Sequence, residues 1–368
     1  MSSLRPDDPR LLSLPTPCAV IDVAALRRNI DTMAHHARKA GIALRPHAKT
    51  QKCAEIARLQ LEAGAAGIAC ATIGEAEALA DAGIASLMIT SPLAGHEKYA
   101  RALRLAARTD LTLTIDHPDH LAQIELVRSR KALPVSVVVE LDVGQGRSGT
   151  QSVAAAVSLA ERAVFSPAVL FCGIQGFAGQ VQHIAEHDAR EHGARQVADA
   201  LRHTLDGLRQ AGITADIVTG GGTGTFDFDC AGPFNEVQVG SYVFMDADYR
   251  RITGGNGAAL PFGQSLFILA TVVSANREGQ VTVDAGTKAL AFNGPAPDLI
   301  LGMPKGAAYG FAGDEHGIIR LAPESAPPPL GSRVLLAATH CDPTANLYGS
   351  YTAISAERID KWPVLGRH

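Results

Sequence analysis

The chain has 368 residues, of which 46% are hydrophobic and 19% charged, and its formal net charge at pH 7 is −4. This balance is typical of an ordinary globular protein and excludes the basic excess of a nucleic-acid-binding protein. No run approaches the roughly 18 uninterrupted apolar residues of a membrane span. The six cysteines form no CxxC pair, so neither a disulfide framework nor a zinc cluster is predicted. Reduced cysteines and a polar start favour the cytoplasm.

From residue 42 onward, apolar strand-like runs alternate with helix-like runs. The predicted strands cover residues 42–44, 67–72, 87–90, 111–115, 135–141, 169–174, 217–218 and 237–241. Continuous apolar strands of this kind are buried on both faces, as in a parallel sheet. Eight such strands, separated by helices over roughly 200 residues, predict an α/β fold, a (β/α)8 TIM barrel. A doubly wound open sheet is the alternative, but no GxGxxG motif follows an early strand.

After residue 255 the helical periodicity fades and short β-like runs take over. These runs cover residues 266–273, 280–283, 317–321 and 333–339, with turn-forming glycine and proline clusters between them. They predict a C-terminal β domain. The run at 17–21 would be a ninth strand for the barrel, so we assign it to the β domain. The predicted boundaries are 24–255 for the barrel and 1–23 plus 256–368 for the β domain.

Lys49 comes just after the first predicted strand, in the run RPHAK at 45–49. Most lysines are solvated surface charges, but in a β/α barrel the strand ends on the C-terminal face carry the chemistry. A lysine held there and partly desolvated can lower its pKa and form a Schiff base with an aldehyde. His47, two residues earlier on the same strand face, could lie against the ring of an aldehyde cofactor or simply pack.

Other polar groups follow later strands of the predicted barrel. Arg147 follows the fifth strand, His183 follows the sixth, and a glycine run at 219–225 follows the seventh. Because the carboxyl ends of barrel strands open onto one face, we expect these groups to lie near Lys49.

The glycine run predicts a phosphate site. Barrels often bind phosphate with the loops after strands seven and eight, where glycines let backbone N–H groups approach the oxygens. Gly221, Gly222 and Thr223 are the candidate ligands, and Tyr242 after the eighth strand could complete the cradle. A plain flexible turn and a packed tyrosine are the alternatives. A Schiff-base lysine that faces a phosphate site is what pyridoxal phosphate requires.

A second cluster, His340-Cys341-Asp342, closes a predicted strand of the β domain. Side chains at i and i+2 of a strand point the same way, so His340 and Asp342 can bind one cation while Cys341 faces away. Imidazole plus carboxylate suits a divalent first-row metal such as Mn²⁺, with Mg²⁺, Co²⁺ or Zn²⁺ as alternatives. A solvated His–Asp surface pair is the other interpretation.

Taken together, these segments resemble the D-threonine aldolase / D-serine dehydratase family of fold-type III pyridoxal-phosphate enzymes, and the likeness covers nearly the whole chain. The matching motifs lie at 45–49, 144–147, 179–183, 219–224, 240–246, 314–317 and 339–344. The resemblance implies an alanine-racemase-like barrel with a β domain, and a homodimer. It makes Lys49 the Schiff-base lysine, Arg147 a neighbour of the cofactor ring and His183 a catalytic base. It also makes His340 and Asp342 the metal ligands.

Details of the motifs bear on the branch and on the substrate. Members that resemble D-serine dehydratase tend to bind zinc through His-x-Cys, whereas the aldolases carry His-Cys-Asp, as here. Two positions depart from the family pattern, which commonly has histidine in place of Gln51 and tyrosine in place of Phe177. We expect both to influence substrate choice, together with Asp314 and His316 of the 314–317 motif.

The sequence therefore predicts a carbon–carbon lyase that uses pyridoxal phosphate and a divalent metal. Its expected substrates are D-configured β-hydroxy-α-amino acids resembling D-threonine, which it would cleave to glycine and an aldehyde. The alternative is a dehydratase that acts on D-serine or a 3-hydroxyaspartate by β-elimination. A racemase or a non-catalytic pyridoxal-phosphate carrier is a further alternative, although carriers lack a second domain and a metal pair.

Overall fold

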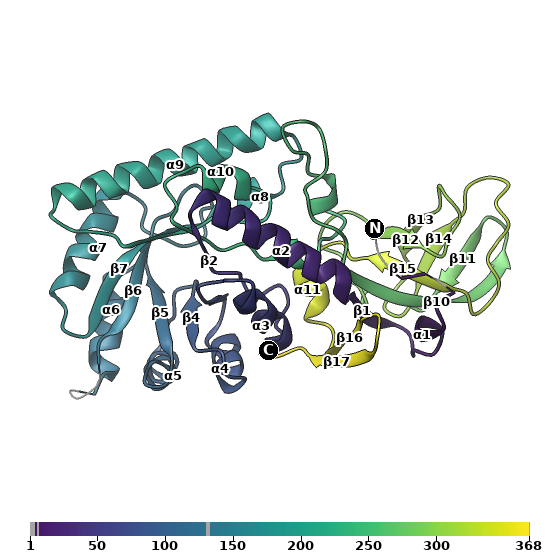
Figure 1. The fold of residues 1–368 in the computed structure, drawn as a ribbon, viewed down its shortest axis with the longest axis horizontal. Coiled ribbons are helices and arrows are strands. Elements are labelled where there is room, and N and C mark those ends of the chain that lie inside the picture. Colours follow the sequence, from purple (N-terminus) through teal and green to yellow (C-terminus); the bar gives the residue numbers. More distant parts are fainter. Residues whose placement is uncertain (1–3, 6, 130–132, 368) are drawn as a thin grey trace.

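The computed structural model describes residues 4–5, 7–129 and 133–367. Residues 1–3, 6 and 368 of the predicted β domain, and residues 130–132 of the predicted barrel, lie outside the described part. Two sheets lie side by side along the long axis of the molecule, with the parallel one at one end and the second at the other (Figure 1). Within the described ranges, no helix has both the length and the apolar character needed to cross a membrane.

The parallel sheet has eight strands in the order β2-β9-β8-β7-β6-β5-β4-β3. They are β2 (Ala43–Leu44), β3 (Ile68–Cys70), β4 (Ser86–Ile89), β5 (Asp110–Ile115), β6 (Val135–Glu140), β7 (Val169–Gly176), β8 (Ile217–Gly220) and β9 (Glu236–Val237). A parallel bridge between His47 and Ala69 joins the two ends of this order. The backbone N–H of Ala48 donates to the carbonyl of Ala69 at 2.7 Å across the same junction. The sheet therefore curls into the predicted β/α barrel.

Helices surround this sheet. They are α2 (Val23–Ala40), α3 (Ala54–Glu62), α4 (Ile73–Asp81), α5 (His96–Ala106), α6 (Pro118–Val127), α7 (Val153–Phe165), α8 (Gly179–Gln182), α9 (His187–Gln210) and α10 (Phe226–Cys230), followed by the 3₁₀ turns η1 (Ser241–Val243) and η2 (Tyr249–Arg251). Local signals fix their ends: the Asp22 carboxylate caps α2 by accepting from the N–H of Ala25 at 3.0 Å. At the other end Gly41 takes a left-handed conformation with φ of 72°, which a residue without Cβ adopts freely.

Each predicted barrel run overlaps one observed strand, from β2 to β9. The last run was predicted too long, because the strand ends at Val237 and residues 241–243 form η1. The backbone N–H of Tyr242 donates to the Thr223 hydroxyl at 3.1 Å, and this contact turns the chain toward the glycine run.

The second sheet has nine strands and is mostly antiparallel. They are β1 (Cys18–Asp22), β10 (Leu266–Arg277), β11 (Gln280–Val283), β12 (Asp298–Leu301), β13 (Ala308–Phe311), β14 (Gly317–Arg320), β15 (Arg333–Ala337), β16 (Ser350–Ile354) and β17 (Ile359–Pro363), and the short helices of this part are α1 (Pro9–Leu12) and α11 (Cys341–Ala345). β1 pairs antiparallel with β10 and parallel with β16. The chain thus starts in this sheet, leaves it for the barrel and returns. The exact domain boundaries stay predictions.

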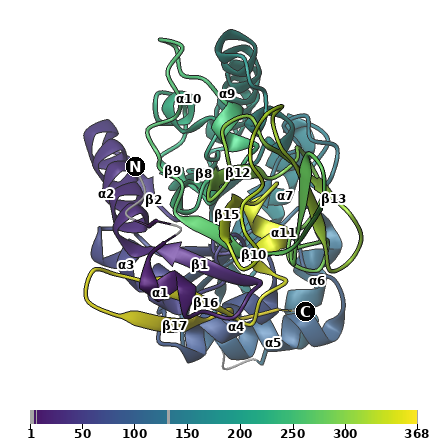
Figure 2. The ribbon, with the colours of Figure 1, turned by 90° about the vertical axis from the view of Figure 1, so that its right-hand side faces the viewer.

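The run predicted at 333–339 is wrong at its end, because β15 stops at Ala337 and α11 begins at Cys341. The N–H of Cys341 donates to the Asp246 carboxylate at 2.9 Å, and the Thr344 hydroxyl donates to the His340 carbonyl at 2.9 Å. These bonds favour a helical turn over a continued strand. Helix α11 lies between the barrel and the second sheet in Figure 1, and Figure 2 shows the molecule from the side of the second sheet.

One apolar cluster extends from the barrel into the second sheet. It includes Leu87, Val137 and Ile268, each of which is completely buried. Burying a side chain of this size stabilises the fold by about 1.5–3 kcal/mol. Because the cluster is continuous, α11 is held at a defined place beside the open end of the barrel.

Candidate active site

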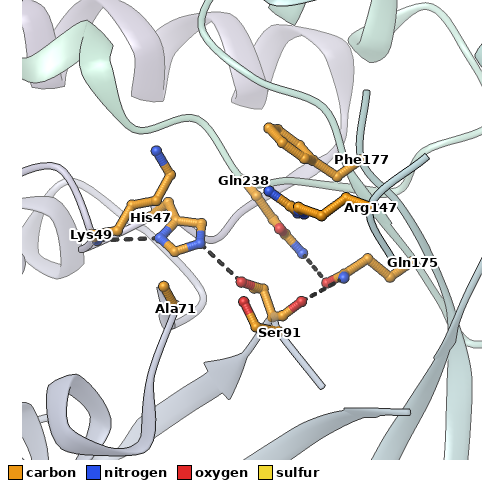
Figure 3. A pocket seen from close by; sticks show the side chains of 9 residues that line it. His47, Lys49, Ala71, Ser91, Arg147, Gln175, Phe177 and Gln238 are labelled. Atoms are coloured by element: carbon orange, nitrogen blue, oxygen red, sulfur yellow. Dashed lines mark hydrogen bonds between the residues drawn. The ribbon is translucent and has the colours of Figure 1, made fainter. Parts of the chain in front are cut away.

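A pocket opens at the carboxyl ends of the barrel strands (Figure 3). Its lining residues are His47, Lys49, Ala71, Thr90, Ser91, Arg147, Gln175, Phe177 and Gln238. The sequence placed Lys49, His47, Arg147 and Phe177 near one another, and the structure brings these residues together in this pocket.

The imidazole of His47 is fixed by two hydrogen bonds. Its Nδ1 accepts from the backbone N–H of Lys49 at 3.2 Å, and its Nε2 lies 2.9 Å from the Thr90 hydroxyl. Since Nδ1 is an acceptor, Nε2 carries the proton and donates to Thr90. Burial, and then the charge of Lys49, lower the pKa of His47 to about 3. His47 is therefore a neutral ring with both nitrogens engaged, which suits packing against a cofactor and not proton transfer.

The amine of Lys49 forms an ion pair with the Asp342 carboxylate, and the lysine side chain is 39% exposed. Burial by itself lowers the pKa of Lys49, but the negative charge of Asp342 outweighs it and raises the pKa. The lowered pKa expected from the sequence is therefore wrong for this structure, because that argument had no carboxylate beside the amine. The same pair keeps the pKa of Asp342 low: burial opposes ionisation, but the charges of Lys49 and His340 overcome it.

Arg147 reaches the pocket from the loop after β6. The Asp142 carboxylate shapes this loop by accepting from the N–H groups of Gly144 at 3.0 Å and Gln145 at 2.9 Å. The guanidinium then lies 5.4 Å from the centre of the Phe177 ring, a cation–π distance. A tyrosine at 177 would keep this contact, so Phe177 differs from the family residue only by the missing hydroxyl.

The glycine run joins β8 to α10 and folds tightly. A Cβ on Gly221 would meet an Asp229 carboxylate oxygen at 2.4 Å, and one on Gly222 would meet the Gln182 amide at 2.4 Å. Only glycine fits this path. The Gly222 N–H donates to Asp229 at 3.1 Å and the Gly224 N–H to Gln182 at 3.0 Å. Part of the predicted cradle is therefore already paired with side chains.

The rest of the cradle adjoins the Lys49 segment. The Thr223 hydroxyl accepts from the N–H of Tyr242, while the Tyr242 hydroxyl accepts from Gln60 at 3.0 Å. A Cβ on Gly240 would lie 2.7 Å from the Thr50 hydroxyl, so η1 passes directly beside the residue that follows Lys49. This region contains the backbone N–H groups of glycines, the cationic guanidinium of Arg147 and the amine of Lys49. Together these donors fit pyridoxal phosphate.

His340 and Asp342 flank the start of α11. The His340 Nε2 lies 3.9 Å from a carboxylate oxygen of Asp342, and the His340 Nδ1 lies 2.8 Å from Asp246. Two adjacent ligands that each lie about 2.1 Å from a shared ion are roughly 3.0–3.4 Å apart in octahedral or tetrahedral geometry. A small side-chain movement would therefore let this pair share a cation. The sequence paired these two residues for the wrong reason, since they lie at a helix start and not on a strand face.

The strand argument predicted that Cys341 faces away from His340 and Asp342, but in the structure it does not. It is fully buried, its Sγ lies 3.5 Å from Asp342, and the ligand atoms of Asp246, His340 and Cys341 all lie within 4.8 Å of one another. Burial, and then the charges of Asp246 and Asp342, raise the thiol pKa well above its usual value. Without a cation the thiol therefore stays protonated, and a bound cation would have to displace that proton before the sulfur could become a ligand.

His183 ends the short helix α8 and joins this cluster. Its ring centre lies 5.8 Å from that of His340 at a right angle, and 4.7 Å from that of Tyr249. The His183 Nδ1 lies 2.8 Å from the Asp248 carboxylate, and the side chain is 37% exposed. The candidate base and the candidate metal ligand are thus immediate neighbours.

The other residues that the sequence linked to substrate choice, Gln51, Asp314 and His316, do not line the pocket. Gln51 is buried and points into the barrel wall, where its amide donates to Gln60 at 3.3 Å. Asp314 and His316 are exposed on the turn between β13 and β14, in the second sheet. The Asp314 carboxylate accepts from Thr287 at 3.4 Å in that turn.

Sequence reasoning missed two groups of contacting residues. Asp246 and Asp248 each hold a histidine of the site, although Asp246 closes one of the motifs that carried the resemblance. The i and i+2 spacing of two carboxylates just after the eighth strand was the available signal. Gln175 and Gln238 form the base of the pocket and bond to each other at 3.1 Å (Figure 3). Isolated glutamines in buried strands gave no such signal.

Comparison with known proteins gives two family matches. The family described as "Alanine racemase, N-terminal domain" matches residues 21–248, and "Putative serine dehydratase domain" matches residues 265–354. The two matches correspond in large part to the barrel and to the second sheet.

Individual relatives match almost end to end. A D-threonine aldolase of Arthrobacter sp. is 38% identical over 367 residues, which cover 99% of this chain and 95% of the relative. A 3-hydroxy-D-aspartate aldolase of Paracoccus denitrificans (strain Pd 1222) is 32% identical over 360 residues, covering 96% and 92%. The crystal structure of D-threonine aldolase from Filomicrobium marinum superposes with a TM-score of 0.93 at 34% identity and covers 97% of each chain.

Proposed function

The chain belongs to the alanine racemase N-terminal domain family, and from this premise we propose that it is a pyridoxal-phosphate- and divalent-metal-dependent aldolase. It would cleave D-β-hydroxy-α-amino acids resembling D-threonine to glycine and an aldehyde. The observation that carries the proposal is that one site holds both the Lys49 amine and the His340–Asp342 pair. An amine for the cofactor and a cation site for a substrate hydroxyl are the two requirements of this reaction.

Pyridoxal phosphate is the cofactor used by this family, and the residues present fit it. When bound, it supplies an aldehyde that condenses with an amine and a ring that accepts the electron pair left at Cα. Lys49 would hold the aldehyde carbon, and the neutral His47 ring would pack against the cofactor. Arg147 would face its polar edge. The phosphate ligands would come from Gly221, Gly222, Thr223 and Tyr242, and the Gly222 N–H would have to exchange its bond to Asp229 for one to the phosphate.

His340 and Asp342 would form the cation site. A divalent cation held there acts as a Lewis acid and makes a bound hydroxyl more acidic. Two protein ligands leave several positions open, and nitrogen plus oxygen donors without a thiolate suit Mn²⁺, with Mg²⁺, Co²⁺ or Zn²⁺ as alternatives.

His183 would be the general base. Because its Nδ1 lies against Asp248, its Nε2 is the nitrogen left to accept a proton from the β-hydroxyl of the substrate. Loss of that proton lets the hydroxyl carbon become an aldehyde carbon as the Cα–Cβ bond breaks. A positioned base of this kind contributes about 10²–10⁴-fold to the rate.

A second candidate is β-elimination from D-serine or a 3-hydroxyaspartate, favoured by the serine-dehydratase match of the second domain. The products separate the two reactions: glycine plus an aldehyde, or ammonia plus an oxo acid. Racemisation would leave the carbon skeleton intact. A carrier without activity is disfavoured by the presence of the second sheet and of the His340–Asp342 pair.

Substrate choice would depend on side chains around the pocket. Phe177 lines it beside Arg147, which supports a direct influence. Gln51 could act only indirectly, through Gln60 and Tyr242. Asp314 and His316 lie on an exposed turn of the second sheet and do not line the pocket. We propose a homodimer on the family resemblance. All six cysteines are free, which supports a cytoplasmic location.

The test is a product assay over D- and L-β-hydroxy-α-amino acids, with and without a chelator. We expect glycine and aldehyde from D-substrates only, loss of activity in chelator, and recovery with Mn²⁺. His340→Ala should lose activity while keeping bound cofactor, since Lys49 and the phosphate cradle are untouched. Ammonia and an oxo acid as main products would favour the dehydratase. Activity that withstands chelation would remove the metal from the proposal.

A further inference from the structure

Two Asp–His pairs in the site come from one three-residue segment, Asp246-Ala247-Asp248, which links η1 to η2. Asp246 Oδ2 lies 2.8 Å from His340 Nδ1, and Asp248 Oδ2 lies 2.8 Å from His183 Nδ1. His183 belongs to the barrel, whereas His340 belongs to the second domain. We propose that Asp246 and Asp248 are positioning residues that orient the metal-binding and the proton-accepting imidazole from a single segment. The inference rests on the proposed function.

Asp246 is completely buried, and both of its oxygens receive hydrogen bonds. Oδ1 accepts from the backbone N–H groups of Asp248 at 3.1 Å and Tyr249 at 2.9 Å. Oδ2 accepts from the N–H of Cys341 at 2.9 Å and contacts His340 Nδ1. Every neighbour of this carboxylate is thus a donor, so His340 Nδ1 carries a proton. The lone pair of its neutral ring is then on Nε2, the nitrogen that faces Asp342.

Asp248 does the same for the other ring at a more open position. Its side chain is 29% exposed, and the His183 side chain is 37% exposed. The carboxylate accepts from the Nδ1–H of His183, so the lone pair of the neutral ring is on Nε2. The rings stand at right angles with centres 5.8 Å apart. One segment therefore sets both which nitrogen of each imidazole is available and how far apart the two imidazoles lie.

The segment is also anchored to both domains. The Ala247 N–H donates to the carbonyl of Ala338, which lies between β15 and His340, at 2.9 Å. Since Asp246 Oδ1 fixes the N–H of Asp248, the carboxylate that orients His340 also fixes the backbone that presents Asp248. A plain helix cap for α11 would need only the bond to Cys341. It would not need a second carboxylate two residues later on the other histidine.

The experiment measures Mn²⁺ binding to metal-depleted holoenzyme, by the electron paramagnetic resonance signal of free Mn²⁺, alongside activity. Asp246→Asn brings an amide NH₂ group against donors, so His340 loses its fixed orientation and Mn²⁺ affinity should fall about 10–100-fold. Its activity should recover as Mn²⁺ is raised. Asp248→Asn should bind Mn²⁺ within about twofold of wild type, yet lose about 10–100-fold in kcat at saturating Mn²⁺. Asp248→Glu should restore part of this loss.

Controls separate positioning from simple disruption. Asp227→Asn alters another Asp–His contact, to His36 at 3.5 Å on the outside of the barrel, and should change neither quantity. If Asp246→Asn does not fold, Asp246→Ser keeps a small acceptor for the backbone but cannot reach His340. Its Mn²⁺ affinity should fall equally.

Two results would overturn the inference. One is a folded Asp246 variant that binds Mn²⁺ as tightly as wild type, and the other is an Asp248→Asn defect that added Mn²⁺ repairs. Neither result would touch the proposed function, because wild type would still bind and use Mn²⁺. If wild type itself bound no Mn²⁺ and ignored chelators, the proposed function would fail first, and the inference with it.

Discussion

At the scale of single residues, the ion pair between Lys49 and Asp342 explains why a lysine is usable in this pocket. The amine sits at a half-exposed strand end, and its counter-charge comes from the second domain. If Lys49 holds the cofactor, its amine is no longer available as an ammonium partner of Asp342, and this carboxylate would be available to a divalent cation. The predicted role of Lys49 in holding the cofactor and that of Asp342 in binding a cation therefore depend on each other.

Replacement of Lys49 tests the first of these roles. Lys49→Ala removes the only group in the pocket lining that can condense with an aldehyde, so the purified protein should lose the yellow absorbance of bound cofactor together with its activity. Absorbance spectra and the product assay measure both. Lys39→Ala, which changes an exposed lysine in the last turn of α2, is the matched control and should retain both. A coloured and active Lys49→Ala protein would contradict the cofactor assignment.

Cys341 tests whether a thiol takes part in cation binding. Because burial and the nearby carboxylates raise its pKa, the thiol stays protonated and we expect it to be a hydrogen-bond donor, not a ligand. Cys341→Ala should lower the free energy of unfolding by about 1 kcal/mol and leave Mn²⁺ affinity nearly unchanged. Denaturation curves and Mn²⁺ titrations check the two parts. Asp342→Cys is the contrasting variant, since a thiolate ligand should shift preference from Mn²⁺ to Zn²⁺.

At the scale of elements, the barrel strands were predictable because they are continuous apolar runs with helices between them. Each predicted run overlaps a strand, since burial on both faces leaves no polar position to confuse the pattern. The strands β12, β13, β16 and β17 were missed. β17 (IDKWP) is polar and contains a proline, and the other three are only four or five residues long, so these strands resemble loops until their partners in the sheet are known.

The site was predictable only in part, for a related reason. Motifs on the barrel named Lys49, Arg147 and the glycine run, because position after a strand fixes the face on which they lie. The environment of Lys49 was not predictable, since Asp342 is 293 residues away in the chain and is brought close only by tertiary structure. The contacts of Asp246 with His340 and of Asp248 with His183 depend on the same long-range packing.

Asp229, in α10, holds the glycine run and makes the stability of the fold depend on pH. Burial, opposed by the hydrogen bonds from Thr225 and Gly222, raises its pKa to about 7. In the unfolded chain the group would ionise near its ordinary value of 3.8. Because the folded pKa is the higher one, folding retains a proton, and the group's contribution to stability is lost as the pH rises from about 4 to about 7.

Asp229→Asn should remove this dependence. The asparagine side chain keeps an oxygen that can accept from Gly222, but it cannot ionise. The stability of the variant relative to wild type should therefore increase with pH and level off above pH 7. Each unit of pKa difference corresponds to about 1.4 kcal/mol. Urea denaturation of both proteins between pH 5 and pH 8 measures the slope. Parallel curves for the two proteins would show that Asp229 is ionised in the folded state throughout.

At the scale of the whole molecule, the end of the chain reaches back to the start of the site. The Leu365 N–H donates to the carbonyl of Lys52 at 2.6 Å, and the Lys52 amine lies 3.3 Å from the carbonyl of Gly366. Lys52 also forms a buried ion pair with Glu75 at 2.5 Å, and its backbone is left-handed with φ of 45°. This strained residue comes three positions after Lys49, so the tail and β17 hold the segment that presents the amine.

Removal of the tail tests this long-range support. A chain that ends at Pro363 loses the bond from Leu365 and the bond to Gly366, and Val364 no longer donates to Gly349. At about 1 kcal/mol for each hydrogen bond, we expect a loss of about 2–3 kcal/mol in the free energy of unfolding. Lys49 should also be held less firmly, so cofactor should dissociate faster on dialysis. Arg367→Ala leaves these backbone contacts in place and should behave like wild type. If the truncated protein keeps its cofactor as long as wild type does, the Lys49 segment is fixed by Glu75 and the barrel alone, and the tail contributes only stability.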